Sequence, residues 1–216
     1  SMLLWSDLVP RSLYAEPELS RTFKAQGDAR HDYRVLGYLI GDGSFLKLSS
    51  QQKLSEEEMT SLQMQTLANN TAIYFDFDRM DGMEPYRTLR HNHLLDTVLA
   101  YGPATYVFDD ESPVLETSAL DQLYNYDVWK KVAPEEKVKD LPKRIPLLSM
   151  MNVKYVYSPF ELQDSRLALI RSIPIVVPSG GYAMNVYENT TVMPRVYVAR
   201  SGEFAASERD AFLSVI

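Results

Sequence analysis

Short strand-like runs crowd into the last third of the chain and constrain its fold more than any other feature. They are rich in Val, Ile and Tyr, and Pro and Gly turns separate them. The runs lie at 153–157, 173–177, 182–187 and 195–198. Gly180-Gly181, which follows Pro178-Ser179, is typical of a hairpin turn and not of an oxyanion or phosphate cradle. These runs predict a β-sheet.

The first half of the chain favours helices. Ser55 is a good N-cap and Glu58 three residues later completes a capping box, which predicts a helix to about Asn69. Further on, 86–99 and 118–131 space their apolar residues in a way that is compatible with one helical face. The leading segment, residues 1–28, is predicted to be extended and to end in a short helix.

Two more strands, a surface connection and a last helix complete the expected order of elements. The pattern predicts strands at 31–40, before a turn at 41–43, and at 71–77. Three prolines among Lys and Glu make 132–146 a predicted surface connection, and 207–216 is a predicted last helix. The expected fold class is therefore α+β (mixed α/β): a mixed β-sheet packed with helices, with a helix-rich first half and a strand-rich second half, in a single domain over 29–216.

Composition excludes several classes of protein. With 45% hydrophobic and 24% charged residues in 216, the chain is an ordinary globular one. A net charge of -7 argues against nucleic acid as a partner, and the lack of cysteine excludes disulfides and thiolate zinc sites. No window approaches the roughly 20 apolar residues that span a bilayer. Because Ser1-Met2 is not a natural translation start, we expect an excised piece whose targeting and spanning segments lie elsewhere.

Asp76-Phe77-Asp78 is the clearest candidate for a metal site. On a strand, residues two apart point to the same face, so Asp76 and Asp78 together could hold a divalent cation, as the DxD pair of nucleotide-sugar glycosyltransferases does. The competing interpretation is a solvated strand end. A calcium loop that starts at Asp76 is excluded, because its fifth and sixth positions are Met80 and Asp81 instead of an oxygen ligand and Gly.

Other catalytic signals are weaker. His91 and His93 are two residues apart on a predicted helix, so their side chains point in different directions and a joint metal site is disfavoured. We expect both to lie on a polar helix surface. His31 is the one other histidine of the sequence. The sequence contains no nucleophile elbow, phosphate-binding glycine loop or zinc-protease motif, so we assign no catalytic residue and no cofactor. Fourteen tyrosines and two tryptophans could line a glycan groove, although most are expected in the core.

Several short stretches follow one another in a characteristic order: 33–36, 67–70 leading to 81–85, an Arg-containing segment at 86–95, 151–156, 186–189 and 194–198. Taken in this order, they resemble the soluble extracytoplasmic portion of YfhO-type bacterial membrane proteins. The resemblance covers about Tyr33 to Val198. Met83, Ala68 and Met193 depart from the family pattern. The residues that carry the resemblance are Tyr33, Arg34, Gly82, Asn152, Tyr155, Tyr187, Glu188, Asn189, Pro194 and Arg195.

The resemblance implies a domain on the outer side of the bacterial cell membrane. It would belong to a multi-spanning, glycosyltransferase-like protein of the cell envelope that decorates cell-surface polysaccharide or teichoic-acid-type polymers with sugar carried on polyprenyl phosphate. Its partners would be its own membrane-spanning part and cell-surface glycan. In that enzyme group, an acidic residue on a loop between early membrane spans serves as the base that activates the acceptor hydroxyl. Nothing in this chain matches that loop, so the resemblance implies that the piece itself is non-catalytic. Whether the full-length protein is an enzyme stays open. The alternatives are a scaffold for assembly or transport of surface polymer, and a free-standing enzyme that uses Asp76 and Asp78.

Two of these residues have a predicted structural role. Asn189 follows a strand and precedes a turn, where its side chain can bond nearby backbone groups. Arg195 can pair with a carboxylate such as Glu188 on an adjacent strand, or bind a phosphate; we favour the carboxylate.

Overall fold

The protein folds around one four-stranded sheet, seen in a computed structural model. The structure describes residues 15–27, 32–40, 55–68, 71–80, 133–139, 141–177 and 180–198, with Gly202, Phe204 and Ala206. The strand order is β1-β2-β4-β3; β1 runs parallel to β2, and the other two pairs are antiparallel. The strands are β1 (Arg34–Gly37), β2 (Val153–Ser158), β3 (Leu167–Val177) and β4 (Gly180–Asn189).

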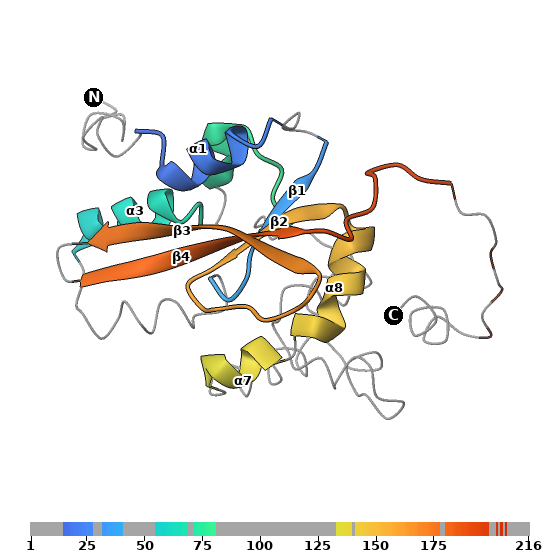
Figure 1. Ribbon diagram of the computed structural model, residues 1–216. Coiled ribbons are helices and arrows are strands. Elements are labelled where there is room, and N and C mark those ends of the chain that lie inside the picture. The colour runs from blue at the N-terminus through green and yellow to red at the C-terminus, as the bar shows by residue number, and fades with distance from the viewer. Residues whose placement is uncertain are drawn as a thin grey trace.

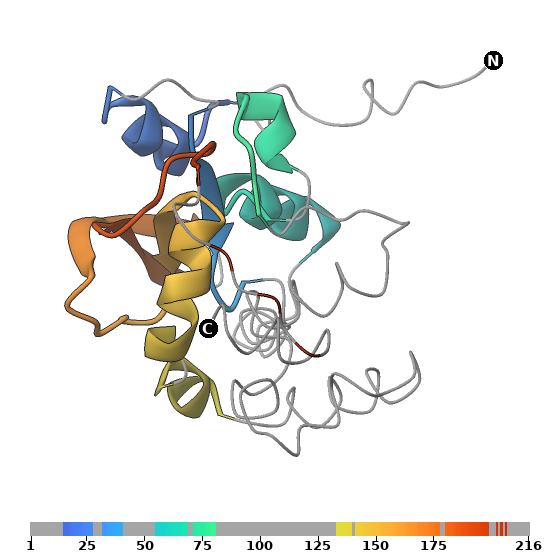
Figure 2. The ribbon, with the colours of Figure 1, turned by 90° about the vertical axis from the view of Figure 1, so that its right-hand side faces the viewer.

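Helices cover both faces of the sheet. Figure 1 shows α1 and α3 above it and α7 and α8 below it, and Figure 2 shows α3 and α8 on opposite sides of β1. The helices are α1 (Glu18–Lys24), α3 (Glu56–Gln65), the 3₁₀ helix η3 (Thr71–Phe75), α7 (Pro134–Lys139) and α8 (Leu141–Met150). This arrangement confirms the predicted α+β class, with helices mostly in the first half and strands later. Among the described residues, no helix is both long enough and apolar enough to cross a membrane.

Strand β2 lies at the centre of two hydrophobic cores. Tyr155 and Tyr157 belong to the core under α1 and α3, whereas Val153 and Val156 belong to the core against α8. All four are buried, so β2 is a nearly continuous apolar run instead of an alternating one, as expected of a strand covered on both faces. In the first core, Phe23 of α1 contacts three rings: Phe77 at 5.6 Å, Tyr155 at 5.4 Å and Tyr157 at 5.8 Å between centroids.

The best predictions from sequence concern local signals. Helix α3 begins with the expected capping box: the Ser55 hydroxyl accepts from the Glu58 N–H at 3.3 Å, and the Glu58 carboxylate accepts from the Ser55 N–H at 2.8 Å. The expected hairpin joins β3 to β4, with Val177 opposite Gly180, so both glycines of Gly180-Gly181 lie in β4 itself.

The strand predicted at 71–77 is wrong. Residues Thr71–Phe75 form η3, in which Ala72 and Phe75, three apart, are buried and Tyr74 is exposed. A period of three is that of a 3₁₀ helix and not of a strand. Asp76 then takes a left-handed φ of 67° and ends the helix.

The surface connection predicted at 132–146 is also wrong, because most of this stretch is helical. Pro134 is the first residue of α7 and Pro142 lies in the first turn of α8, where a missing N–H costs nothing. Lys137, Arg144 and Ile145 are fully buried. Pro134 and Pro142 therefore lie at the starts of helices here instead of marking a loop.

The last predicted strand, 195–198, is not a strand in the structure either. Val196 and Val198 are 86% and 90% exposed, so their β-forming side chains have no neighbouring strand to pack on. The turn at 41–43 and the helices predicted at 86–99, 118–131 and 207–216 lie outside the described residues.

The two edges of the sheet differ in what lies beside them. Along β1, the Val35 N–H donates to the Asp78 carbonyl at 2.9 Å and the Met80 N–H donates to the Val35 carbonyl at 3.0 Å. Strand β3 forms the other edge. It contains Pro174, which has no N–H, and a register shift between Leu169 and Arg171. Proline and irregular register are typical of an edge strand that resists further pairing.

Helix α8 contains a proline in its interior, and an arginine from another segment compensates for it. Pro146 cannot donate to the carbonyl of Pro142, four residues earlier. The Arg166 guanidinium donates to that carbonyl instead, at 2.7 Å. Both oxygens of Asp164 hold the guanidinium, each at 2.8 Å. The turn before β3 is thereby attached to α8.

We expect Arg166→Ala to lower the free energy of unfolding by about 2 kcal/mol, because it leaves a helix carbonyl and a carboxylate without their donor. The loss should be smaller when Pro146→Ala is introduced first, since an N–H at position 146 can then bond the Pro142 carbonyl. Urea unfolding of the two single variants and the double variant measures this coupling. Strictly additive effects would show that the two residues do not share the carbonyl.

Candidate functional site

Three of the residues that carry the family resemblance meet at one end of the sheet, where β2 begins and β4 ends. Arg34 opens β1, Asn152 immediately precedes β2, and Asn189 closes β4. Two residues outside the resemblance complete the group, Ser149 at the end of α8 and Thr191 after β4. We call these five residues, Arg34, Ser149, Asn152, Asn189 and Thr191, the strand-end cluster.

Asn189 is the centre of the strand-end cluster and is 1% exposed. Its amide nitrogen donates to the Val153 carbonyl and to the Ser149 hydroxyl, both at 3.0 Å. Its amide oxygen accepts from the Thr191 N–H at 3.1 Å and from the Thr191 hydroxyl at 2.8 Å. The predicted role of Asn189, bonding nearby backbone at a strand end, is confirmed. The side chain of Asn189 thereby links the end of β4 to β2 and α8 through hydrogen bonds.

Asn152 and Arg34 continue the cluster toward β1. Asn152 adopts a left-handed φ of 60°, which asparagine tolerates better than most residues. Its amide nitrogen donates to the Met193 carbonyl at 2.8 Å. The Arg34 guanidinium donates to the Met151 carbonyl at 2.9 Å, and the Arg34 N–H donates to the Asn152 carbonyl at 2.9 Å. These polar groups hold backbone in place.

The proposed metal pair does not have the geometry that suggested it. Asp76 and Asp78 follow η3 instead of lying on a strand, and Asp76 has a left-handed φ, so the period-two argument for a shared face fails. Asp78 forms an ion pair with Arg195 at 2.7 Å. Within the described ranges, no three His, Cys, Asp or Glu side chains gather in a way that could hold a metal ion.

Arg195 therefore pairs with a carboxylate, as predicted, but the partner named from sequence is wrong. Glu188 instead lies 3.7 Å from the ammonium of Lys154 on the neighbouring strand β2. The difference arises because the chain after β4 turns across the end of the sheet and reaches the segment beside β1. No strand at 195–198 exists to place Arg195 next to Glu188.

The remaining motif residues have structural contacts or lie at the surface. Tyr33 is buried and packs edge-to-face on Tyr155, with 4.9 Å between ring centroids. The Tyr187 hydroxyl accepts from the Leu162 N–H at 3.0 Å, and burial raises the pKa of this phenol. Pro194 is exposed, and Gly82 lies outside the described residues, as do the three histidines.

Sequence reasoning missed two buried cations and an acid-arginine pair. Lys137 and Arg144 are both fully buried on the α8 side of the sheet, where the Lys137 carbonyl accepts from the Tyr38 hydroxyl at 3.1 Å. Asp164 and Arg166 are two apart in an unremarked turn. The signal in the sequence was the apolar residues that surround Lys137 and Arg144 at helical spacing, which the prolines obscured.

The Asp164–Arg166 pair gives a pH dependence with a definite sign. Hydrogen bonds from Arg166 hold the pKa of the Asp164 carboxyl below its ordinary 3.8. Its contribution to stability is therefore complete above that value and is lost as pH falls through the lowered pKa. We expect the stability difference between wild type and Asp164→Asn to be constant above about pH 5 and to shrink on acidification below about pH 4.

Urea unfolding across this pH range measures the difference. Glu136→Gln is the matched control, because its carboxylate pairs with Lys139 on the surface of α7 and is mostly exposed. A difference for Asp164→Asn that stayed constant down to the lowest pH would contradict the assignment.

Comparison with known proteins returned no match to this chain, whether among family models, curated proteins or solved structures. The assignment of function therefore depends on the residues themselves and on the resemblance described above.

Proposed function

We propose that this chain is an extracytoplasmic domain of a multi-spanning bacterial membrane protein of the YfhO type, resembling the glycosyltransferases that use sugar carried on polyprenyl phosphate. The domain itself is non-catalytic. It stands outside the membrane and contacts the acceptor polymer or closes over a site in the membrane part. The ordered motifs from Tyr33 to Val198 support this proposal, and nine of the ten motif residues lie in the described part of the chain.

One observation carries the non-catalytic role. The polar motif side chains best suited to chemistry are engaged in internal contacts: Arg34 with the Met151 carbonyl, Asn189 with four groups of its own chain, and Arg195 with Asp78. A general acid or base must instead reach a substrate proton. These motifs are better explained as what holds the sheet end together than as a reaction centre.

Contact with an acceptor glycan would need aromatic rings at the surface. Among the described tyrosines, Tyr33, Tyr38, Tyr155, Tyr157 and Tyr187 are buried. Tyr74 is 69% exposed and Tyr197 is 44% exposed, so these two rings offer faces on which a sugar can stack. They are the side chains of choice for a glycan-array experiment, with Tyr74→Ala and Tyr197→Ala as variants and Tyr157→Phe as a control that keeps the buried ring.

The proposal is tested on the complete protein from its native gene, in a strain that lacks it. Restored sugar on the surface polymer, measured by mass spectrometry after hydrolysis, supports the enzyme assignment if it requires both this domain and an acidic residue of a loop between early membrane spans. Restoration that survives replacement of every such acid would support a scaffold for polymer assembly. A native gene that encodes only a free-standing protein of this length would overturn the proposal.

A further inference from the structure

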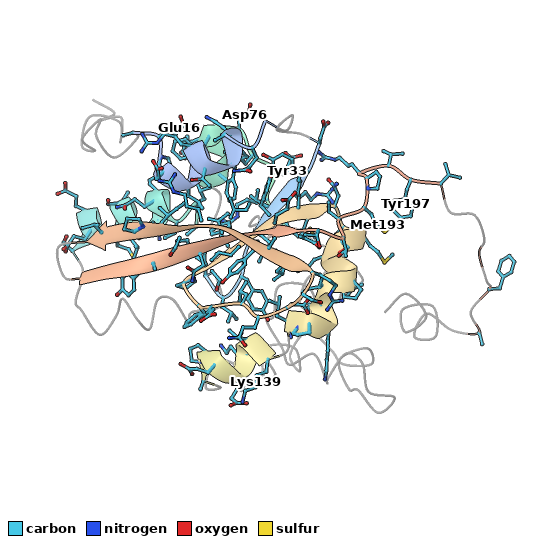
Figure 3. The ribbon with its side chains drawn as sticks, in the orientation of Figure 1. Glu16, Tyr33, Asp76, Lys139, Met193 and Tyr197 are labelled. Carbon is cyan, nitrogen blue, oxygen red and sulfur yellow. The ribbon has the colours of Figure 1, made fainter. Side chains whose placement is uncertain are left out.

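The chain after β4 crosses the end of the sheet as a strap. Residues 190–195, which we call the strap, leave β4 beside α8, pass the start of β2 and reach Asp78 on the far side of β1. Figure 3 shows Met193 next to the end of α8 and Tyr197 farther along the same segment. The strap therefore joins both sides of the sheet end.

The two halves of the strap are held differently. In the first half, the Thr190 N–H and hydroxyl both donate to the Arg166 carbonyl, at 2.9 and 3.0 Å, and Thr191 bonds the buried Asn189. In the second half, residues 192–195, the Val192 N–H donates to the Asn189 carbonyl within the same turn at 3.3 Å, the Met193 N–H donates to the Ser149 carbonyl at 3.0 Å, and the Met193 carbonyl accepts from Asn152. The Arg195–Asp78 pair that follows has side chains 39% and 34% exposed, where ion pairs contribute little.

The closed position of the second half also has a defect. Asn152 is 5% exposed, and its amide oxygen is buried with no hydrogen-bond partner among the described residues. A buried acceptor without a donor is costly, whereas water would satisfy it if the strap lifted. Closing the strap therefore satisfies the amide nitrogen of Asn152 at the expense of its oxygen.

We propose that residues 192–195 detach from the sheet end as a unit while Thr190 and Thr191 stay bound, so that the strap has a closed and an open position. The side chains just beyond it, Val196 and Val198, are exposed and apolar. A contact made on Val196 or Val198 therefore acts directly on the second half of the strap. The strap is thus a conformational device that links the outer surface to the strand-end cluster.

Amide hydrogen exchange of the whole 216-residue chain, followed by nuclear magnetic resonance, tests this device. We expect the Met193 N–H to exchange about tenfold faster than the Thr190 N–H after correction for intrinsic rates, because local opening exposes only the second half. Arg195→Gln should raise the Met193 rate about threefold and leave Thr190 unchanged, as expected when a partly exposed ion pair is lost. Ser172→Ala, which removes an exposed hydrogen bond to Asn185 elsewhere in the sheet, should change neither rate.

A charge at position 152 provides an independent test. In Asn152→Asp, an ionised carboxylate would face the Met193 carbonyl, so the ratio of the Met193 rate to the Thr190 rate should rise about tenfold near neutral pH. Protonation at acid pH restores a donor, and the ratio should then fall back toward that of the wild type. Equal rates for Met193 and Thr190 in the wild type, or a variant that raises both by the same factor, would show that the strap opens only with global unfolding and would overturn the proposal.

Discussion

Replacing Phe23 with alanine is expected to lower the free energy of unfolding by about 4 kcal/mol, the usual cost of emptying a buried phenylalanine site. Phe23 is fully buried and its ring contacts the rings of Phe77, Tyr155 and Tyr157. These rings come from two segments, strand β2 and the residues after η3, so the residues around the cavity cannot close it without moving a strand. Helix α1 has only seven residues and depends on this contact to stay on the sheet.

Chemical denaturation monitored by circular dichroism measures the loss. Phe23→Leu keeps most of the apolar volume and should cost about 1 kcal/mol. Phe204→Ala makes the same change at a fully exposed ring and should stay within about 0.5 kcal/mol of wild type. A small effect of Phe23→Ala, equal to that of Phe204→Ala, would mean that α1 does not contribute to the cooperative core.

Asn189→Ala is expected to cost about 3 kcal/mol, because it removes the partner of several groups at once, one of them fully buried. The Val153 carbonyl loses its donor, and the Thr191 N–H and hydroxyl lose their acceptor. Water cannot easily reach the Val153 carbonyl, because Val153 and Asn189 are almost completely buried. Asn189→Asp should be no better, because a carboxylate cannot donate to the Val153 carbonyl.

The matched control lies on the same strand. Asn185 of β4 is half-buried and accepts from the Ser172 hydroxyl at an exposed position. Asn185→Ala should therefore cost less than about 1 kcal/mol in the same urea titration. If both asparagines cost the same, the strand-end cluster would have no special role in the fold.

Much of the fold was predictable where a local signal and the tertiary structure agree. The capping box of Ser55 and Glu58 fixes the start of α3 by itself, because both of its bonds lie within one turn. Strand β2 was found because its residues are apolar on both faces, which suits no position other than a covered strand. The β3–β4 hairpin followed from two apolar runs on either side of a predicted turn at Gly180-Gly181, although both glycines belong to β4 itself.

The failures have a common physical cause: composition does not determine the neighbours. Thr71–Phe75 has strand-forming residues but no strand beside it, and a three-residue period buries Ala72 and Phe75 instead. Residues 195–198 have a similar composition and likewise no neighbouring strand in the part of the chain that the structure describes. In α8, Pro146 would break an isolated helix, and only the distant Arg166 makes it tolerable.

The strand-end cluster shows the same division. Asn189 was found because its motif and its local role at a strand end coincide. The partner of Arg195 could not be found, because Asp78 is more than a hundred residues earlier and meets it only through the path of the strap. Ser149 and Thr191 escaped notice, since a lone hydroxyl carries no signal until another polar group lies opposite it.

The edges of the sheet restrict how this domain can bind another molecule. Residues 78–80 already lie against one edge strand, and the other edge strand contains Pro174 and an irregular register. Recruitment of a peptide by backbone pairing is therefore disfavoured on either side. Selectivity must then come from side chains and loops, which can diverge between relatives while the sheet beneath them stays the same.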